Sequence, residues 1–233
     1  MQIGETKNEH RLLFSGDIKY EKSWLFDAAT VRFPRADTLV IESTYGGPQD
    51  FQPNRVDATQ EIQDLIKLAV SRSGKVFCPV FAVGRSQEVM LAIDQLFKSG
   101  DVSPVTVWLD GMISEATAIH ASHPDFLNRD LRRQVLKGGE ENPFNSPWFK
   151  QVDSREQRES IINDPSPCIV LATSGMMTGG PIMEYFKNWA PELNNTLCFV
   201  GYQASGTLGR RLQSGHPAVS YTHLRAHETE ADL

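Results

Sequence analysis

Continuous apolar runs separated by amphipathic segments constrain the fold of this chain more than any other feature. The runs are KVFCPVFAV (residues 75–83), VTVWL (105–109), CIVLA (168–172) and TLCFV (196–200). Strands that are apolar on both faces are typical of parallel sheets, which helices cover on each side. The sequence therefore predicts an α/β fold with a doubly wound, mostly parallel sheet.

Helices are predicted where apolar side chains recur at helical spacing, at residues 54–72, 86–98, 114–123, 129–136, 154–162 and 182–189. Gly74 and Gly100 are expected to end the first two helices, because glycine favours the left-handed conformation that follows many helices. Shorter strands are expected at residues 12–14, 38–41 and 149–152. The segments alternate along the chain, as a doubly wound sheet requires.

Composition narrows the class of protein further. Hydrophobic residues make up 40% of the 233 positions, so a buried core is expected. The formal net charge of -6 argues against a generally basic surface, although a local basic groove stays open. Cys78, Cys168 and Cys198 lie far apart in apolar runs, which indicates buried free thiols in a reducing compartment. With no apolar run near 18 residues and no signal-peptide pattern, we expect a soluble cytoplasmic protein and no membrane partner.

Polar or glycine-rich residues follow five of the predicted strands, at residues 42–47, 84–88, 110–111 (Asp110-Gly111), 173–180 and 201–203 (Gly201-Tyr202-Gln203). We expect these five exits to converge on one sheet edge, which is where ligands bind in open α/β sheets. The loop at residues 173–180 (TSGMMTGG) is the most suggestive, because glycines let backbone N–H groups approach an anion. Arg85 also leaves a strand and could bind a phosphate with its planar fork. The alternative is that these glycines only form tight turns and that Arg85 pairs with Glu88. The loop does not match the P-loop pattern, which excludes a P-loop NTPase.

Two acids stand at the ends of short strands. Asp17 follows a Ser-Gly turn, and ordinary turn chemistry would account for it locally. Glu42 directly follows an apolar strand, where a partly buried carboxylate needs a metal, a histidine or a cluster of N–H groups. His120 and His123 lie three apart on a predicted helix, and a solvated helix end is the interpretation we favour for them.

Six motifs occur in the order and spacing of a known family: SGDIKY, IESTYGG, PVFAVGRSQE, ENPF, LATSGMMTGGP and VGYQASGTLGRR. Over about residues 12–215 the chain resembles the β-CASP branch of the metallo-β-lactamase superfamily, in particular archaeal homologues of the cleavage and polyadenylation specificity factor nuclease. The resemblance implies a β-CASP domain at residues 48–215 and, at residues 1–47, the remnant of a metallo-β-lactamase αββα core. Such proteins are zinc-dependent endoribonucleases, some with 5′-3′ exonuclease activity, that act in RNA 3′-end processing and transcription termination.

The resemblance also implies roles for individual residues. Asp17 matches the aspartate that bridges two zinc ions, and Glu42 matches an acid that pairs with a histidine thought to protonate the leaving group. RNA would contact the motif loops, through Tyr45, Arg85, Ser174, Gly175 and Met176. The implied partners are RNA, the transcription or RNA-processing machinery and a second copy of the protein, and archaeal relatives commonly carry KH-like domains upstream.

The chain departs from the family pattern in its histidines. The HxHxDH zinc motif is absent, and Asp17 is the one expected zinc ligand, so we expect this polypeptide alone to lack nuclease activity. Residues 216–233, with His216, His223 and His227, are interpreted as a non-native tail that resembles a translated sequencing adapter. Two alternatives stay open: an inactive β-CASP paralogue that serves as a complex subunit, and an unrelated α/β phosphate- or nucleotide-binding module.

Overall fold

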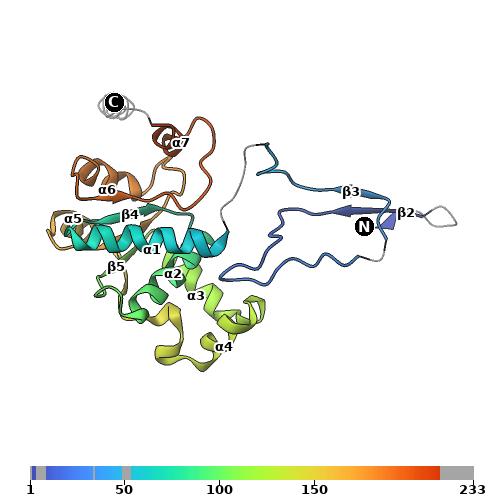
Figure 1. Cartoon of the computed structure of the whole chain (residues 1–233), viewed down its shortest axis with the longest axis horizontal. Coiled ribbons are helices and arrows are strands. Elements are labelled where there is room, and N and C mark those ends of the chain that lie inside the picture. The colour runs from blue at the N-terminus through green and yellow to red at the C-terminus, as the bar shows by residue number, and fades with distance from the viewer. Residues whose placement is uncertain (1, 4–8, 34, 49–53, 216–233) are drawn as a thin grey trace.

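The computed structural model describes residues 2–3, 9–33, 35–48 and 54–215. These residues form an α/β domain (residues 54–215) and an N-terminal arm (residues 9–48) that extends from it, as Figure 1 shows. The tail at residues 216–233, interpreted above as non-native, lies outside the described residues. In the part of the chain that the structure describes, no helix combines the length and apolarity that crossing a membrane would need.

A five-stranded parallel sheet forms the centre of the α/β domain, in the order β6-β5-β7-β4-β8. The chain order of the strands differs from their spatial order, as a doubly wound sheet requires. The predicted parallel sheet is therefore confirmed. Its strands are β4 (Val76–Pro79), β5 (Val107–Asp110), β6 (Phe149–Gln151), β7 (Ile169–Ala172) and β8 (Thr196–Leu197).

Both faces of this sheet are buried, because alternate residues of each central strand enter different hydrophobic cores. Ile169 and Leu171 of β7 pack into one core, and Val170 and Ala172 pack into the other. Figure 1 shows helices on either side of the strands. The helices are α1 (Arg55–Ser71), α2 (Arg85–Ser99), α3 (Ile113–Ser122), α4 (Arg129–Lys137), α5 (Arg155–Asn163), α6 (Ile182–Trp189) and α7 (Leu208–Gln213).

Several boundaries differ from the sequence predictions. Strand β4 ends at Pro79, so Phe81 and Val83 lie in an exposed loop, and β8 stops at Leu197. Ser73, with φ 55°, is the left-handed residue after α1, whereas a side chain at Gly74 would meet the carbonyl oxygen of Asn194. Gly74 is therefore required for close backbone approach and not for the helix end that was predicted.

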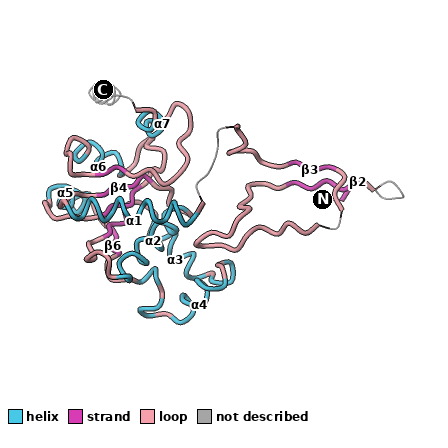
Figure 2. Tube along the Cα trace, in the orientation of Figure 1, coloured by secondary structure: helices cyan, strands magenta, loops and turns pink. Residues whose placement is uncertain are grey.

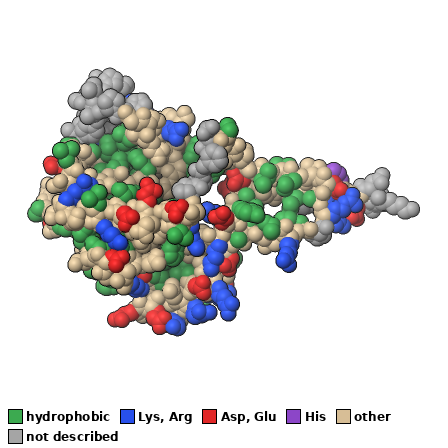
Figure 3. Space-filling model, in the orientation of Figure 1, with side chains coloured by type: hydrophobic (Ala, Val, Ile, Leu, Met, Phe, Trp, Pro, Cys, Tyr) green, Lys and Arg blue, Asp and Glu red, His purple; other side chains and the backbone are tan. Residues whose placement is uncertain are grey.

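The arm contains a second, smaller sheet. Strand β2 (His10–Phe14) pairs in parallel with β3 (Thr38–Val40) and antiparallel with β1 (Gln2–Ile3). The rest of the arm is mostly loop, as Figure 2 shows. Apolar side chains remain exposed along it, as Figure 3 shows, among them Phe14, Val31, Phe33, Leu39 and Ile41. The small sheet therefore buries little apolar surface of its own, and the assignment of residues 1–47 to a metallo-β-lactamase core stays a prediction.

One turn of the arm is anchored in the α/β domain. Leu25 is fully buried among core residues of that domain. The backbone N–H of Asn128 donates to Leu25 O at 2.7 Å, and its side-chain amide donates to Trp24 O at 2.6 Å. The same side chain accepts from the first turn of α4, so Asn128 joins the arm to the start of that helix.

Candidate functional site

The structure brings Asp17 and Glu42 to the same edge of the small sheet. Strands β2 and β3 run in parallel, and Ser15 N–H donates to Val40 O at 2.9 Å just beyond the paired residues. The Ser15 hydroxyl then accepts from Glu42 N–H at 3.1 Å. The backbone N–H of Ile18, which follows Asp17, also contacts the Glu42 carboxylate. The two acids therefore occupy one corner, where two strands of the arm end.

Glu42 is held as a carboxylate by the backbone. The N–H of Thr44 donates to Glu42 Oε2 at 2.9 Å and, as the largest cause, lowers the pKa of Glu42, with a further contribution from Ile18 N–H. Of the three partners that the sequence left open for Glu42, a cluster of N–H groups is the one observed. Partial burial of the side chain raises its pKa, but by less than the hydrogen bonds to Thr44 lower it.

The residues at this corner do not form a complete metal site. Asp17 is exposed, and the described part of the chain contains no group of three or more His, Cys, Asp or Glu side chains suited to a metal ion. A structural zinc ion takes about four protein ligands and a catalytic one about three. A single bridging carboxylate therefore does not fit zinc by itself.

The glycine-rich loop after β7 is held from two sides. A side chain at Gly175 would lie 2.8 Å from Phe81 N, so only glycine fits against the loop that follows β4. On the other side, Gln203 is buried and donates to Gly175 O at 2.8 Å. Ser174 uses its hydroxyl within the loop, where it accepts from Thr178 N–H at 3.0 Å. That N–H group is therefore already engaged inside the loop, and anion binding by the other N–H groups stays a prediction.

Arg85 lies at the start of α2 and pairs with Glu88 at 2.7 Å. This is the alternative that the sequence left open, although 45% of the Arg85 side chain remains exposed. The turn before α2 is fixed by Gln87, which is fully buried, accepts from Gly84 N–H at 2.7 Å and donates to Thr117 Oγ1 at 2.9 Å. Met176 is half-buried in the neighbouring loop.

Four of the five strand exits belong to the large sheet, and the exit that carries Glu42 belongs to the arm. The expectation that all five share one sheet is therefore wrong. An aromatic contact nevertheless joins the two edges, because Tyr45 of the arm packs edge-to-face on Tyr202, which follows β8, with ring centroids 5.8 Å apart. Sequence reasoning noted the Gly201-Tyr202-Gln203 exit without assigning Tyr202 a role.

A second set of buried polar groups was not predicted, although Asp110 had been noted at a strand exit. The Asp110 carboxylate is almost fully buried and accepts two hydrogen bonds from Arg158, at 2.7 and 2.9 Å, and one from the Tyr185 hydroxyl at 2.8 Å. These contacts with Asp110 raise the pKa of Arg158, while burial raises the pKa of Tyr185. A polar cavity of about 460 Å³ lies beside them. Because both carboxylate oxygens of Asp110 already accept hydrogen bonds, we infer that the cluster stabilises the fold.

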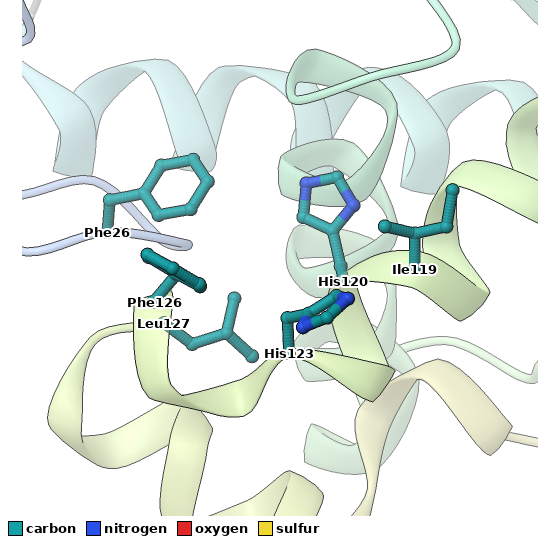
Figure 4. A pocket seen from close by; sticks show the side chains of 6 residues that line it. All are labelled: Phe26, Ile119, His120, His123, Phe126 and Leu127. Carbon is teal, nitrogen blue, oxygen red and sulfur yellow. The ribbon is translucent and has the colours of Figure 1, made fainter.

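His120 and His123 lie away from the sheet edges, around an apolar pocket of about 300 Å³ (Figure 4). The other lining residues are Phe26, Ile119, Phe126 and Leu127. The Nδ1 atom of His120 bonds the carbonyl oxygen of Ala116 at 2.7 Å, within its own helix. His120 is therefore half-buried between the arm and α3, whereas His123 is exposed at the C-terminal end of α3, as predicted for a solvated helix end.

Comparisons with known proteins identify the sequence family of this chain. A sequence family described as the Beta-Casp domain matches residues 86–212. Three proteins named transcription termination factor FttA are similar: those of Methanosarcina mazei, Cenarchaeum symbiosum and Methanocaldococcus jannaschii, at 53%, 48% and 47% identity over 91%, 89% and 92% of this chain. The aligned part covers 33%, 32% and 33% of those relatives, so the chain spans about a third of their length. Because the family match extends over more than half of the sequence, the chain belongs to the Beta-Casp domain family.

Proposed function

We propose that this chain is the β-CASP part of a transcription termination factor that hydrolyses phosphodiester bonds in RNA during 3′-end formation. The observation that carries the proposal is the corner of the arm where Asp17 and Glu42 meet, since Tyr45 connects it to Tyr202 at the edge of the large sheet. The family and the name of the relatives support the same reading. An unrelated phosphate-binding module is excluded by the family assignment.

The ionisation state of Glu42 favours a positioning role over a role as proton donor in this reaction. Two N–H donors keep its carboxylate ionised near neutral pH, so it is a poor proton donor itself. An ionised carboxylate instead orients and stabilises a protonated histidine, which is the role that the family resemblance implies. Glu42 is therefore proposed as the acid that positions a general-acid histidine beside the leaving oxygen.

Asp17 is proposed as one ligand of a two-zinc centre in the longer protein, because its side chain is exposed and the next residue, Ile18, lies close to the Glu42 carboxylate. When bound, such metal ions would activate water and neutralise phosphate charge. The other ligands would come from sequence that this chain does not span in its relatives. We accordingly propose that the 233-residue chain by itself does not cleave RNA.

Substrate RNA is proposed to lie along the edge of the large sheet. Tyr45 of the arm and Arg85 at the start of α2 are each partly exposed, and the loop with Ser174, Gly175 and Met176 packs at Gly175 against the loop that precedes α2. Cytoplasmic action fits the three free and buried cysteines, because a reducing compartment keeps thiols unpaired. Dimerisation and contact with the transcription or RNA-processing machinery are parts of the same proposal for the whole protein.

The test uses a full-length protein that carries this sequence and a labelled single-stranded RNA. Asp17→Asn is expected to abolish cleavage, and Glu42→Gln to slow it by about 10²-fold or more. RNA binding, measured by fluorescence anisotropy, should stay near the wild-type level in both variants. Asp27→Asn is the matched control, because Asp27 is an exposed aspartate of the same arm with no contact to the acid corner.

The same assay separates the proposal from its remaining alternative. If the full-length protein binds RNA and cleaves none under any metal supply, the inactive-paralogue reading replaces the nuclease. If Asp17→Asn unfolds the protein, as thermal denaturation would show, Asp17 is a structural turn residue. A loss of cleavage with an unchanged unfolding temperature supports the proposed role.

A further inference from the structure

Tyr45 and Tyr202 form an aromatic pair between two parts of the molecule that are distant in sequence. Their ring centroids lie 5.8 Å apart at an interplanar angle of 89°. Tyr45 follows β3 in the arm, and Tyr202 follows β8 at the edge of the large sheet. The pair therefore spans the gap between the acid corner and the glycine-rich edge.

Each ring stands on a fixed turn. The Ser43 carbonyl accepts from Gly46 N–H at 2.9 Å, and the preceding residue, Thr44, donates to Glu42, so the turn that bears Tyr45 also holds the acid. Beside the other ring, the Gln203 side chain donates to Gly175 O at 2.8 Å and Gly201 O at 3.3 Å. Both rings are consequently positioned relative to the two predicted functional elements.

The exposure of the pair leaves part of each ring available to a ligand. Tyr45 is 44% exposed and Tyr202 is 45% exposed. By contrast, Tyr185, which packs on Trp189 in the core, has no exposed surface. Two aromatic rings that served only to join the arm to the domain would bury more of their faces.

Flat apolar surfaces of this kind suit unpaired nucleobases. Proteins that bind single-stranded RNA stack its bases on Tyr, Phe or Trp rings, and the preference is for single strands because duplex bases are already stacked. The charge of the chain also favours contacts with bases over contacts with phosphate. Its formal net charge is -6, and Arg85 is already paired with Glu88. Contacts with phosphate alone would therefore give weak binding.

We propose that Tyr202, together with Tyr45, forms a stacking site for one base of single-stranded RNA, next to the phosphodiester that is cleaved. The proposal rests on the proposed RNA-cleaving function and adds to it a binding residue, Tyr202, that stacks on a base. We place the stacked base next to the cleaved bond because Tyr45 directly follows Thr44, whose N–H donates to the Glu42 carboxylate.

The test compares removal of the Tyr202 ring with removal of single bases from the RNA. Full-length protein is given single-stranded RNA oligonucleotides in which one nucleotide at a time is replaced by an abasic ribose, and kcat/KM is measured for each. Wild-type protein is expected to lose about tenfold with an abasic residue at one position beside the cleavage site. With intact RNA, Tyr202→Ala should have a kcat/KM about tenfold below that of the wild-type protein. An abasic residue at the sensitive position should lower the kcat/KM of this variant no further. Tyr202→Phe should behave as the wild-type protein does.

Two further variants keep the result interpretable. Tyr202→Leu retains apolar volume without a flat ring, and it should match Tyr202→Ala even if the alanine variant folds poorly. Phe126→Ala removes another exposed aromatic ring, one that lines the apolar pocket around His120, and it should leave the abasic pattern unchanged.

The outcomes separate this inference from the function on which it rests. If wild-type protein cleaves RNA and Tyr202→Ala shows the same abasic losses as wild type at every position, the stacking site is wrong and the nuclease proposal stands. If Tyr202→Phe behaves like Tyr202→Ala, the hydroxyl and not the ring is used, which also overturns stacking. If the wild-type protein neither binds nor cleaves RNA, both proposals fail.

Discussion

Single residues in this domain show how buried charge is tolerated only when every donor and acceptor is engaged. Asp110 would be strongly destabilising alone, because an ionised carboxylate loses its hydration on burial. Two hydrogen bonds from Arg158 and one from Tyr185 replace that hydration. The cluster also fixes the exit of β5 at Gly111, against which Thr173 of the glycine-rich loop packs. The Asp110 cluster thus helps to position the glycine-rich loop at residues 173–180.

Replacement of the arginine should expose this dependence. Arg158→Met leaves Asp110 buried without its cationic partner, and we expect the free energy of unfolding to fall by about 3–5 kcal/mol. Urea denaturation followed by tryptophan fluorescence measures the change. Arg155→Met on the same helix is the control, because the ion pair of Arg155 with Glu159 is exposed and contributes about 0.5 kcal/mol or less. Equal losses in the two variants would contradict the role given to Asp110.

A second residue-scale prediction concerns pH. Burial, as the largest cause, raises the pKa of Cys168 from its ordinary value of 9.0 to about 12. The unfolded thiol ionises above pH 9 while the folded thiol stays protonated, so stability falls as pH rises through this window. Between pH 8 and pH 10 the wild-type protein should lose about 1.4 kcal/mol relative to Cys168→Ala. Urea denaturation of both proteins at pH 8 and pH 10 measures that difference, and parallel pH profiles would contradict it.

At the scale of elements, the large sheet was predictable and its edges were not. Apolar runs such as CIVLA identify buried parallel strands, because both faces of each strand must be covered. The end of β4 was misplaced because VFAV is as apolar as the strand before it, although Phe81 and Val83 are exposed. Side-chain character alone does not reveal where strand pairing stops.

The candidate site was predictable to a similar degree. Strand exits drew attention to Asp17 and Glu42, and the family resemblance supplied their expected roles. The parallel pairing of β2 with β3 explains why the two strands that precede them end side by side. The contact between Tyr45 and Tyr202 could not be predicted, since it joins residues whose proximity depends on how the arm lies against the large sheet. Long-range contacts of this kind leave no local pattern in a single sequence.

The loops that follow β4, β7 and β8 pack as one unit, and Gly175 lies at their centre. A methyl group at this position would lie 2.8 Å from Phe81 N, a backbone atom that cannot rotate away. Gly175→Ala should therefore lower the free energy of unfolding by about 1–3 kcal/mol, as overpacking does. Gly201→Ala is the control, because its added methyl meets open space, and it should stay within about 1 kcal/mol of wild type. A benign Gly175→Ala, measured by chemical denaturation, would show that the three loops move independently.

At the scale of the whole molecule, the arm and the α/β domain depend on each other although they contain separate sheets. The small sheet leaves apolar side chains such as Phe14 and Leu39 exposed, so it gains little stability from its own core. Its position is set instead by the turn at residues 23–26, where Leu25 enters the core of the α/β domain. The acid corner and the glycine-rich edge are therefore aligned through a contact remote from both.

This arrangement predicts that a buried residue of the arm stabilises the whole molecule. Leu25→Ala removes a fully buried side chain and should lower the free energy of unfolding by about 2–5 kcal/mol. Leu39→Ala in β3 makes the same chemical change at a side chain that is 54% exposed, and it should cost well under 1 kcal/mol. Urea unfolding with tryptophan fluorescence suits the comparison, because Trp24 lies next to Leu25 in the same turn.

The two variants also connect stability to function. In the full-length protein, Leu25→Ala should reduce RNA cleavage at temperatures where the protein is still folded, because a loosened turn lets Asp17 and Glu42 shift relative to the edge that carries Tyr202. Leu39→Ala should leave cleavage near the wild-type rate. If Leu25→Ala loses stability with no loss of cleavage in the folded state, other contacts of the longer protein align the two parts. The turn at residues 23–26 would then contribute to folding alone.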